Sequence, residues 1–149
     1  MTATRALPIA AVSQVLARYN VCGDRGQLAE LVALFTEDGR LTIPLWSAQG
    51  HDEIARCLKL GASFGAVRPT FVRHHLTTSA LSWAGDDVEA RTYFQVITDI
   101  GLDHAGVYID RLTPVATASS WAFREREVRI DWKASNSLFP NLPARNGRA

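Results

Sequence analysis

The sequence is poor in cysteine, lacks long apolar runs and carries almost no excess of charge. Its two cysteines among 149 residues, Cys22 and Cys57, lie far apart and outside any C-x-x-C pattern. This argues against a disulfide framework or a thiolate metal site, and we expect two reduced, buried thiols. No apolar stretch approaches the roughly 20 residues that cross a bilayer. Sixteen Lys and Arg against fifteen Asp and Glu leave a net charge of +1, so we expect neither a nucleic-acid nor a membrane partner.

We expect a single cytoplasmic domain. The apolar run at residues 6–12 is brief and passes directly into helical periodicity, unlike the hydrophobic segment of a signal peptide. A hydrophobic content of 47% over 149 residues is enough for one core. We assign residues 1–138 to this domain, and residues 139–149, with two prolines and several polar residues, to a frayed C-terminal tail.

Helical periodicity is confined to the first half of the chain. Pro8 suits a first helical turn, and apolar residues recur at helical spacing after it. A second apolar stripe stops before Asp38 and Gly39, a pair typical of a turn. The predicted helices span residues 8–21, 28–35 and 52–65, and a short strand interrupted by a proline spans residues 41–45.

β-Branched and aromatic residues dominate from Thr70 onward. Turn residues divide this region into four predicted strands at 70–83, 87–100, 105–117 and 121–132. The joints between them are short, which predicts an antiparallel meander. Since three helices can cover only one face of so long a sheet, we expect the sheet to curl into a cone with a closed apolar interior. The predicted fold class is therefore α+β.

Five short motifs occur in order along most of the chain. They are Tyr19-Asn-Val-Cys-Gly-Asp24, Leu34-Phe-Thr-Glu-Asp-Gly39, Arg73-His-His-Leu76, Gly106-Val-Tyr-Ile-Asp110 and Arg129-Ile-Asp-Trp132. By their order and spacing the chain resembles the SnoaL-like branch of the nuclear transport factor 2 superfamily, which includes polyketide cyclases, scytalone dehydratase and a hexachlorocyclohexane dehydrochlorinase. The resemblance implies a cone-shaped α+β barrel with a cystatin-like fold.

The resemblance also implies a site. In catalytic relatives an Asp at the end of the first helix pairs, inside the cone, with a His on the first long strand, and the corresponding residues here are Asp24 and His74. Two features depart from the family. Gln27 replaces a second Asp found in many members, and no second His occurs between Gln95 and Ile100, where scytalone dehydratase has one.

Asp24 has two interpretations. With Gln27 three residues later, it fits a capping box at the start of the second helix, where its carboxylate would accept a backbone N–H. Alternatively, it lies partly desolvated in a cavity, where a neighbouring His would stabilise its charge and be oriented by it. The residues alone favour neither, whereas the resemblance favours a role beside His74.

Only one of the adjacent residues His74 and His75 can enter the cavity, because neighbouring strand residues point to opposite faces. His74 shares its face with apolar residues and is our candidate general base, with an ordinary core histidine as the alternative. We place His75 at a packing or subunit surface. His51 and His104, at a helix start and a turn, are expected to be exposed, with a place at the pocket mouth as a minor alternative for His104.

Aromatic residues supply the predicted pocket walls. Tyr19 lies five residues before Asp24, so its hydroxyl is expected to reach the cavity and hydrogen-bond a substrate oxygen; its alternative role is in the core. The other predicted substrate-binding residues are Trp46 and Phe64 at the mouth, with Phe94, Val107 and Trp132 on the strands.

Charged strand residues are assigned to the surface. Asp110 is expected to form a ladder with Arg91 or Arg124, and the charges from Arg124 to Arg129 to mark a solvated face or the rim of a subunit interface. The sheet face away from the helices would then be buried between the two subunits of a homodimer. We place Phe71, Tyr93, Tyr108 and Trp121 on that face.

We expect no metal and no cofactor. Adjacent histidines on one strand cannot both reach one ion, and no HxxxH, HxxE or carboxylate cluster accompanies them. The segment Gly23-Asp-Arg-Gly26 lacks the strand, the further glycine and the lysine of a phosphate loop. No G-x-S-x-G elbow is present, and neither cysteine has a basic neighbour expected to activate it.

Together with these patterns, the family resemblance implies a cofactor-independent enzyme of the lyase or isomerase type that acts on a hydrophobic, cyclic or aromatic oxygenated molecule. His74 would take a proton in an elimination, isomerisation or cyclisation, Asp24 would fix the tautomer of His74, and Tyr19 would polarise a substrate oxygen. The alternative is a noncatalytic module that binds a hydrophobic ligand or serves in assembly, resembling the small subunits of ring-hydroxylating dioxygenases.

Overall fold

The computed structural model describes residues 5–60, 67–115 and 117–145, with backbone alone at 117–119. The helices in these ranges are α1 (Ile9–Asp24), α2 (Leu28–Val32) and α3 (His51–Leu60). The strands are β1 (Phe35–Ile43), β2 (Trp46–Gln49), β3 (Val72–Ala84), β4 (Asp87–Thr98), β5 (Gly101–Val115) and β6 (Thr117–Lys133). None of the helices described is both long and apolar enough to cross a membrane.

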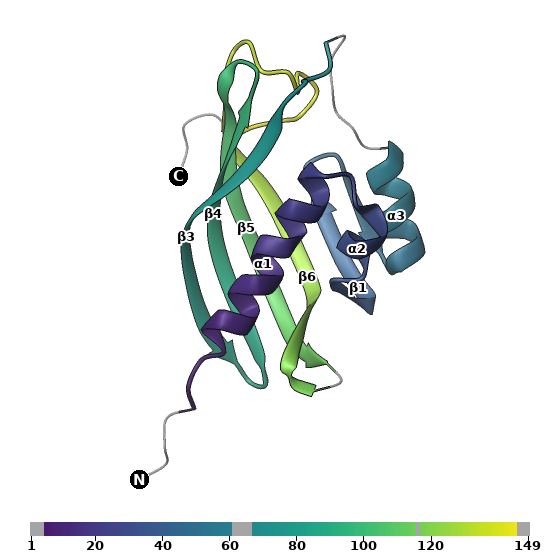
Figure 1. Ribbon diagram of the computed structural model, residues 1–149, viewed down its shortest axis with the longest axis vertical. Helices are drawn as coiled ribbons and strands as arrows, with labels where there is room; N and C mark the ends of the chain where they lie inside the picture. The colour runs from purple at the N-terminus through teal and green to yellow at the C-terminus, as the bar shows by residue number, and fades with distance from the viewer. Residues whose placement is uncertain (1–4, 61–66, 116, 146–149) are drawn as a thin grey trace.

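One curved sheet of order β2-β1-β6-β5-β4-β3 organises the fold. Neighbouring strands are antiparallel except β1 and β6, which pair in parallel. α1 lies across one face of the sheet and contacts β3 and β6, while α3 packs on β1 and β2 (Figure 1). We call this helix-covered face the inner face and the opposite one the outer face. The predicted α+β class is confirmed, but the sheet stays open, with β2 and β3 at its ends.

The second helix is shorter than predicted, because residues 35–43 form β1. Asp38 and Gly39 lie inside this strand and not in a turn. The strand pairs with β6 and brings Gly39 so close that a Cβ there would lie 3.0 Å from the carbonyl oxygen of Phe123. Pairing with a distant strand therefore overrides the helical spacing of the local sequence.

β5 and β6 begin earlier in the chain than predicted. Gly101, with a φ of 90°, opens β5, so the expected joint at 101–104 is strand. β6 begins at Thr117, which makes the expected joint at 118–120 strand as well. The predicted third helix ran to Gly65, but residues 61–66 lie outside the described residues. The earlier start of β5 adds His104 to the sheet.

The C-terminal segment 139–145 packs against the sheet and is not a frayed tail. The Lys133 ammonium at the end of β6 donates hydrogen bonds to the carbonyl oxygens of Phe139, Pro140 and Leu142 at 3.3, 2.9 and 2.8 Å. Leu142 belongs to an apolar cluster with Phe94, Val96, Tyr108 and Ile130, and Phe139 packs against it. Contacts with distant strands anchor this segment, so its local composition did not predict whether it packs or frays.

An ion pair lies inside the core between β5 and β6. The Nε and Nη2 atoms of Arg126 each donate to the Asp110 carboxylate at 2.7 Å, and neither side chain has any exposed surface. The guanidinium carbon lies 4.1, 4.0 and 4.3 Å from the ring centroids of Tyr19, Tyr108 and Phe123. The predicted surface ladder of Asp110 with Arg91 or Arg124 is wrong, because the strand register places Asp110 opposite Arg126 in the core.

Candidate active site

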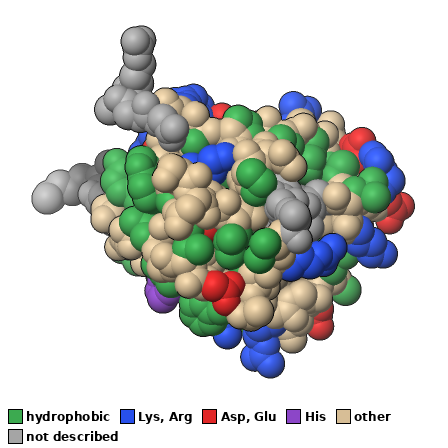
Figure 2. Space-filling model, turned by 90° about the horizontal axis from the view of Figure 1, so that it is seen from above, with side chains coloured by type: hydrophobic (Ala, Val, Ile, Leu, Met, Phe, Trp, Pro, Cys, Tyr) green, Lys and Arg blue, Asp and Glu red, His purple; other side chains and the backbone are tan. Residues whose placement is uncertain are grey.

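A pocket of about 260 Å³ lies between α1 and the inner face of the sheet. It is found toward the end of the molecule where α1 ends, β3 begins and the C-terminal segment packs, which is the upper end in Figure 1. Figure 2 views the molecule from that end and shows hydrophobic side chains exposed there. Ligand sites usually measure about 300–1,000 Å³, so this pocket suits a small molecule. Its polar lining residues are Tyr19, Asn20, His74, His104 and Tyr108.

Asp24 and His74 form a hydrogen-bonded pair at the wall of this pocket. Asp24 ends α1, and His74 lies near the start of β3. The Oδ1 atom of Asp24 is 2.6 Å from Nδ1 of His74, and its Oδ2 atom accepts the backbone N–H of His74 at 3.0 Å. Because both carboxylate oxygens bind the same residue, the imidazole is held in a single orientation. Its Nδ1–H donates to the Asp24 carboxylate, and its Nε2 is free to interact with a ligand in the pocket. The His74 side chain is 28% exposed, so a ligand has access to it.

The capping-box interpretation of Asp24 is wrong. α1 continues to Asp24 instead of ending at Val21, so the carboxylate belongs to the last turn of α1 and points to β3. α2 has Gln27 as its N-cap, and that residue makes no side-chain capping bond. His75, next to His74 on β3, is exposed, as strand alternation requires.

A second histidine–carboxylate pair contributes to the same pocket, and the sequence patterns did not reveal it. His104, predicted at an exposed turn, has a side chain only 5% exposed, and its Nδ1 lies 2.8 Å from Oδ1 of Asp103. Asp103 is fully buried and also accepts hydrogen bonds from the Ser137 and Thr98 hydroxyls and the Leu138 backbone N–H. Burial by itself raises the pKa of Asp103, but the hydrogen bonds from Ser137, His104 and Leu138 outweigh it and hold that pKa below its usual value.

Strand register places the two histidines on the same face. His74, Val96 and His104 are partners across β3, β4 and β5. The Phe94 ring is next to both imidazoles, with its centroid 6.3 Å from that of His74 and 6.5 Å from that of His104. Alternation along β5 gave no signal for His104, because it shares its parity with Tyr108 and Asp110, which the sequence had assigned to the outer side.

We expect acid to destabilise the fold through the His104–Asp103 pair. Burial lowers the pKa of His104 below its ordinary 6.5, although Asp103 opposes the shift. The unfolded chain therefore takes up the proton first, so the stability contributed by His104 is complete above pH 6.5 and is lost as pH falls through the lower folded pKa. The lowered pKa of Asp103 causes a further loss at more acidic pH. Urea unfolding at several pH values between about 8 and 5 gives the free energy of unfolding as a function of pH. This free energy should fall less steeply with decreasing pH for His104→Phe than for the unchanged chain, and an equal pH dependence in the two would contradict the prediction.

Tyr108 lies in the pocket and not on the outer face, where the sequence placed it. Its hydroxyl donates to Oδ1 of Asn20 at 3.0 Å, and the buried Nδ2 of Asn20 has no hydrogen-bond partner among the described residues. The Tyr108 ring stacks on Phe94 with centroids 4.3 Å apart. Trp121, also predicted on the outer face, is buried in the core. Tyr19 lines the pocket, and burial raises the pKa of its hydroxyl against the opposing effect of Arg126, so it stays protonated at neutral pH.

The predicted substrate-binding residues divide between several places. Phe94 lines the pocket. Val107 and Trp132 line a groove on the outer face. Tyr108 points inward, so its neighbour Val107 points outward by strand alternation, to the same side as Trp132. Trp46 on β2 packs against the core and is not a pocket residue. Phe64 lies outside the described residues.

His51 and the two cysteines lie outside the pocket. His51 is half-buried, contrary to prediction, and its Nε2 lies 2.8 Å from the carbonyl oxygen of Phe35. Both cysteines are free thiols, Cys22 buried as expected and Cys57 only partly. Within the part of the chain that the structure describes, no three His, Cys, Asp or Glu residues group closely enough to hold a metal ion.

The fold and the site together define a class of protein, an α+β domain in which helices cover one face of an open, curved sheet and His74, hydrogen-bonded to Asp24, lines the pocket between them. A protein with a cystatin-like fold from Nostoc punctiforme has this architecture. Residues 4–127 match the SnoaL-like domain family, and the chain belongs to that family. The resemblance inferred from the sequence motifs is therefore confirmed.

Solved structures share this fold over most of their length. A putative scytalone dehydratase from Novosphingobium aromaticivorans has a TM-score of 0.74 and 21% identity, covering 95% of this chain and 94% of its own. ActVI-ORFA from Streptomyces coelicolor has a TM-score of 0.72 and 27% identity, covering 83% of this chain and 96% of its own. A protein with a cystatin-like fold from Nostoc punctiforme has a TM-score of 0.72 and 19% identity, covering 93% of this chain and 96% of its own. Comparison with curated proteins finds no match.

Proposed function

We propose that the chain is a cofactor-independent enzyme that transfers a proton on a small cyclic or aromatic oxygenated molecule, in an elimination, isomerisation or cyclisation. The observation that carries the proposal is the Asp24–His74 pair at the wall of a largely apolar pocket, with 2.6 Å between Oδ1 and Nδ1. Similarity to a protein described as a putative scytalone dehydratase supports an elimination in particular.

His74 is the proposed general base. Because its Nδ1 donates to Asp24, the Nε2 lone pair takes a proton from a carbon next to a substrate carbonyl. In an elimination, the C–H electron pair forms a C=C bond while a hydroxyl leaves the next carbon, and the imidazolium returns the proton to that hydroxyl as it leaves as water. Asp24 stabilises the imidazolium in between, and the apolar walls hold the substrate ring and exclude solvent.

Tyr19 is the proposed hydrogen-bond donor to the substrate carbonyl. Its ring lines the pocket, and its hydroxyl keeps its proton at neutral pH because burial raises its pKa. A donor to that oxygen stabilises the negative charge that develops as the C–H proton is removed. Phe94 supplies a flat apolar wall against which a substrate ring packs.

The test uses 3-hydroxy-1-tetralone, a β-hydroxyketone fused to a benzene ring. In D₂O we expect the chain to exchange a proton at C2 for deuterium and to release 1-naphthol after loss of water, both followed by NMR. Binding without exchange or naphthol formation would favour the noncatalytic alternative, a module that only binds a hydrophobic ligand. Exchange without naphthol formation would restrict the proposal to isomerisation or cyclisation.

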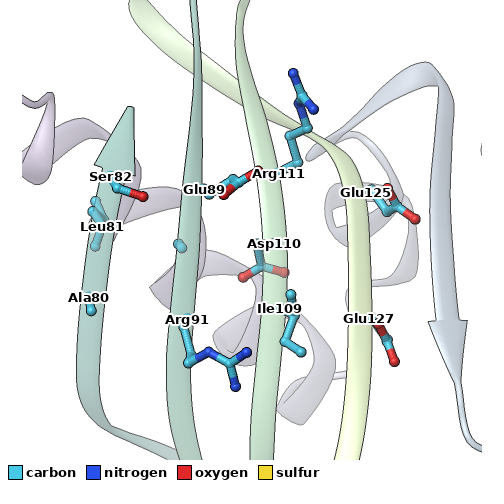
Figure 3. Close-up of a pocket in the computed structure, with 11 residues that line it drawn as sticks. Ala80, Leu81, Ser82, Glu89, Arg91, Ile109, Asp110, Arg111, Glu125 and Glu127 are labelled. Carbon is cyan, nitrogen blue, oxygen red and sulfur yellow. The ribbon is translucent and has the colours of Figure 1, made fainter. Parts of the chain in front are cut away.

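We also propose that the outer face of the sheet is a homodimer interface. It exposes Tyr93 and Trp132 at 49% and 43%. Figure 3 shows residues of both charges on neighbouring strands of this sheet, among them Glu89, Arg91, Arg111, Glu125 and Glu127. Apolar side chains beside interspersed opposite charges suit the two-fold pairing of identical surfaces.

Sedimentation equilibrium at neutral pH should give twice the chain mass at micromolar concentration. Tyr93→Glu is expected to give a folded monomer, because it places a charge within the apolar part of the interface. Ile9→Glu, at an exposed position at the start of α1, should stay dimeric. A monomeric unchanged chain would overturn the interface.

A further inference from the structure

His104 lines the substrate pocket proposed above, yet the proton transfer assigned to His74 does not use it. We infer that Nε2 of His104 is a hydrogen-bond acceptor that selects ligands carrying a ring hydroxyl, and that Asp103 is the positioning residue that keeps it an acceptor. The inference rests on the proposed function, in which this pocket is the substrate site. It adds a substrate class, a hydroxylated compound of about two rings.

The partners of Asp103 determine which nitrogen of His104 carries the hydrogen. Leu138 donates its backbone N–H to the carboxylate at 2.9 Å. The Ser137 oxygen accepts the Phe139 N–H at 3.0 Å and directs its own hydrogen to Asp103 at 2.6 Å. A carboxylate surrounded by donors has no proton to give, so the hydrogen shared with His104 belongs to Nδ1. The Nε2 atom of the neutral imidazole is then unprotonated.

The surroundings keep this imidazole neutral. Its side chain is 5% exposed, and burial is the main reason that its pKa is lowered. Of the charged groups near it, Asp103 favours protonation, whereas His74 and Lys133 oppose it. At neutral pH the pocket therefore presents a lone-pair acceptor at this position.

The pocket beside the His104 imidazole is lined mainly by apolar side chains. Among the described residues His104 is hydrogen-bonded only through Nδ1, and the rings of Phe94 and Phe139 have centroids 6.5 and 4.9 Å from that of the imidazole. An acceptor left unpaired in such a place is unfavourable, so a ligand hydroxyl that pairs with it gains affinity. A ketone oxygen is itself an acceptor and leaves Nε2 unpaired.

The two histidines are placed to hold opposite ends of one ligand. They lie in one row with Val96 between them, and a strand spacing of about 4.8 Å puts their backbones about 10 Å apart. Their side chains line the same pocket of about 260 Å³. This spacing suits a two-ring compound with its reacting carbon at His74 and its hydroxyl at His104.

The test converts the acceptor into a donor. In Asp103→Asn, an amide nitrogen at the Oδ1 position would donate to Nδ1 of His104 and to Oγ of Ser137, which lie 2.8 and 2.6 Å away. The imidazole hydrogen then moves to Nε2. The probes are 2-naphthol, which donates a hydrogen bond, and 1-tetralone, which only accepts one. Calorimetry should show at least about tenfold tighter binding of 2-naphthol to the unchanged chain and the reverse preference for Asp103→Asn.

Two further variants provide controls. His104→Phe removes the acceptor and should bind both probes with similar affinity. His75→Phe, at an exposed position of the same strand as His74, should keep the original preference. Long-range ¹H–¹⁵N spectra of the imidazoles give a readout that needs no ligand, with His104 protonated at Nδ1 in the unchanged chain and at Nε2 in Asp103→Asn.

An unchanged probe preference in Asp103→Asn and His104→Phe, or no binding of either probe to the unchanged chain, would overturn the inference. His74→Ala separates it from the proposed function, because this variant should lose turnover and keep the preference for 2-naphthol. Normal turnover by His74→Ala would count against the proposed function alone. Loss of turnover in that variant, together with an unchanged preference in Asp103→Asn, would count against the inference alone.

Discussion

Replacing Arg126 by methionine is expected to lower the free energy of unfolding by about 3–5 kcal/mol, because the variant leaves a charged group without its partner in the core. Asp110 would keep its buried position, with no exposed surface, and lose both of its 2.7 Å hydrogen bonds from the guanidinium. The guanidinium also packs between aromatic rings, and methionine retains only part of those contacts. Urea unfolding at neutral pH, followed by circular dichroism, measures the loss.

The double variant Arg126→Met, Asp110→Leu tests the cause. With both charges replaced by apolar side chains of similar volume, much of the lost stability should return. Arg124→Met is the matched surface control, since Arg124 is 53% exposed and pairs with Asp87 at 3.3 Å. It should change stability by no more than about 1 kcal/mol. If Arg126→Met and Arg124→Met were equally stable, the ion pair would not be buried as described.

Replacing His74 by alanine is expected to reduce turnover of 3-hydroxy-1-tetralone by a factor of about 10² to 10⁴, the usual contribution of a positioned general base. Deuterium incorporation at C2 should fall by the same factor, because both readouts depend on the same proton abstraction. Naphthol formation followed by absorbance gives kcat and KM, and NMR in D₂O gives the exchange rate.

His75→Ala is the matched control, since His75 neighbours His74 on β3 but is exposed on the other side of the strand. It should retain full turnover. Asp24→Asn should lower kcat with little change in KM, because it removes the charge that stabilises the imidazolium and leaves the pocket walls in place. Turnover within tenfold of normal in His74→Ala would place the base elsewhere.

Local patterns in the sequence were sufficient for most of the fold and for the first histidine of the site. Helical spacing located α1 and the start of α3, and turn residues such as Gly85 separated β3 from β4. Alternation along β3 was enough to turn His74 inward and His75 outward. These features depend on neighbouring residues in the chain, which is why the sequence by itself determined them.

The path of the chain from Val32 to Ile43 depended on tertiary pairing. The local spacing was helical as far as Phe35, yet the residues that follow Leu34 form β1 because β6 offers a parallel partner. The C-terminal segment is a similar case. Its prolines and polar residues indicated fraying, whereas the Lys133 ammonium and an apolar cluster on distant strands hold it in place.

Only the tertiary structure decided which face of β5 lines the pocket. Asp110 and Arg126 are charged, so the sequence pattern turned them to solvent and, by alternation, placed Tyr108 outward and Val107 inward. Their mutual hydrogen bonds bury both side chains and reverse that assignment, which brings Tyr108 and His104 into the pocket. Hydrophobicity and periodicity describe a residue within its own strand. Whether a charge can be buried depends instead on a partner that another strand supplies.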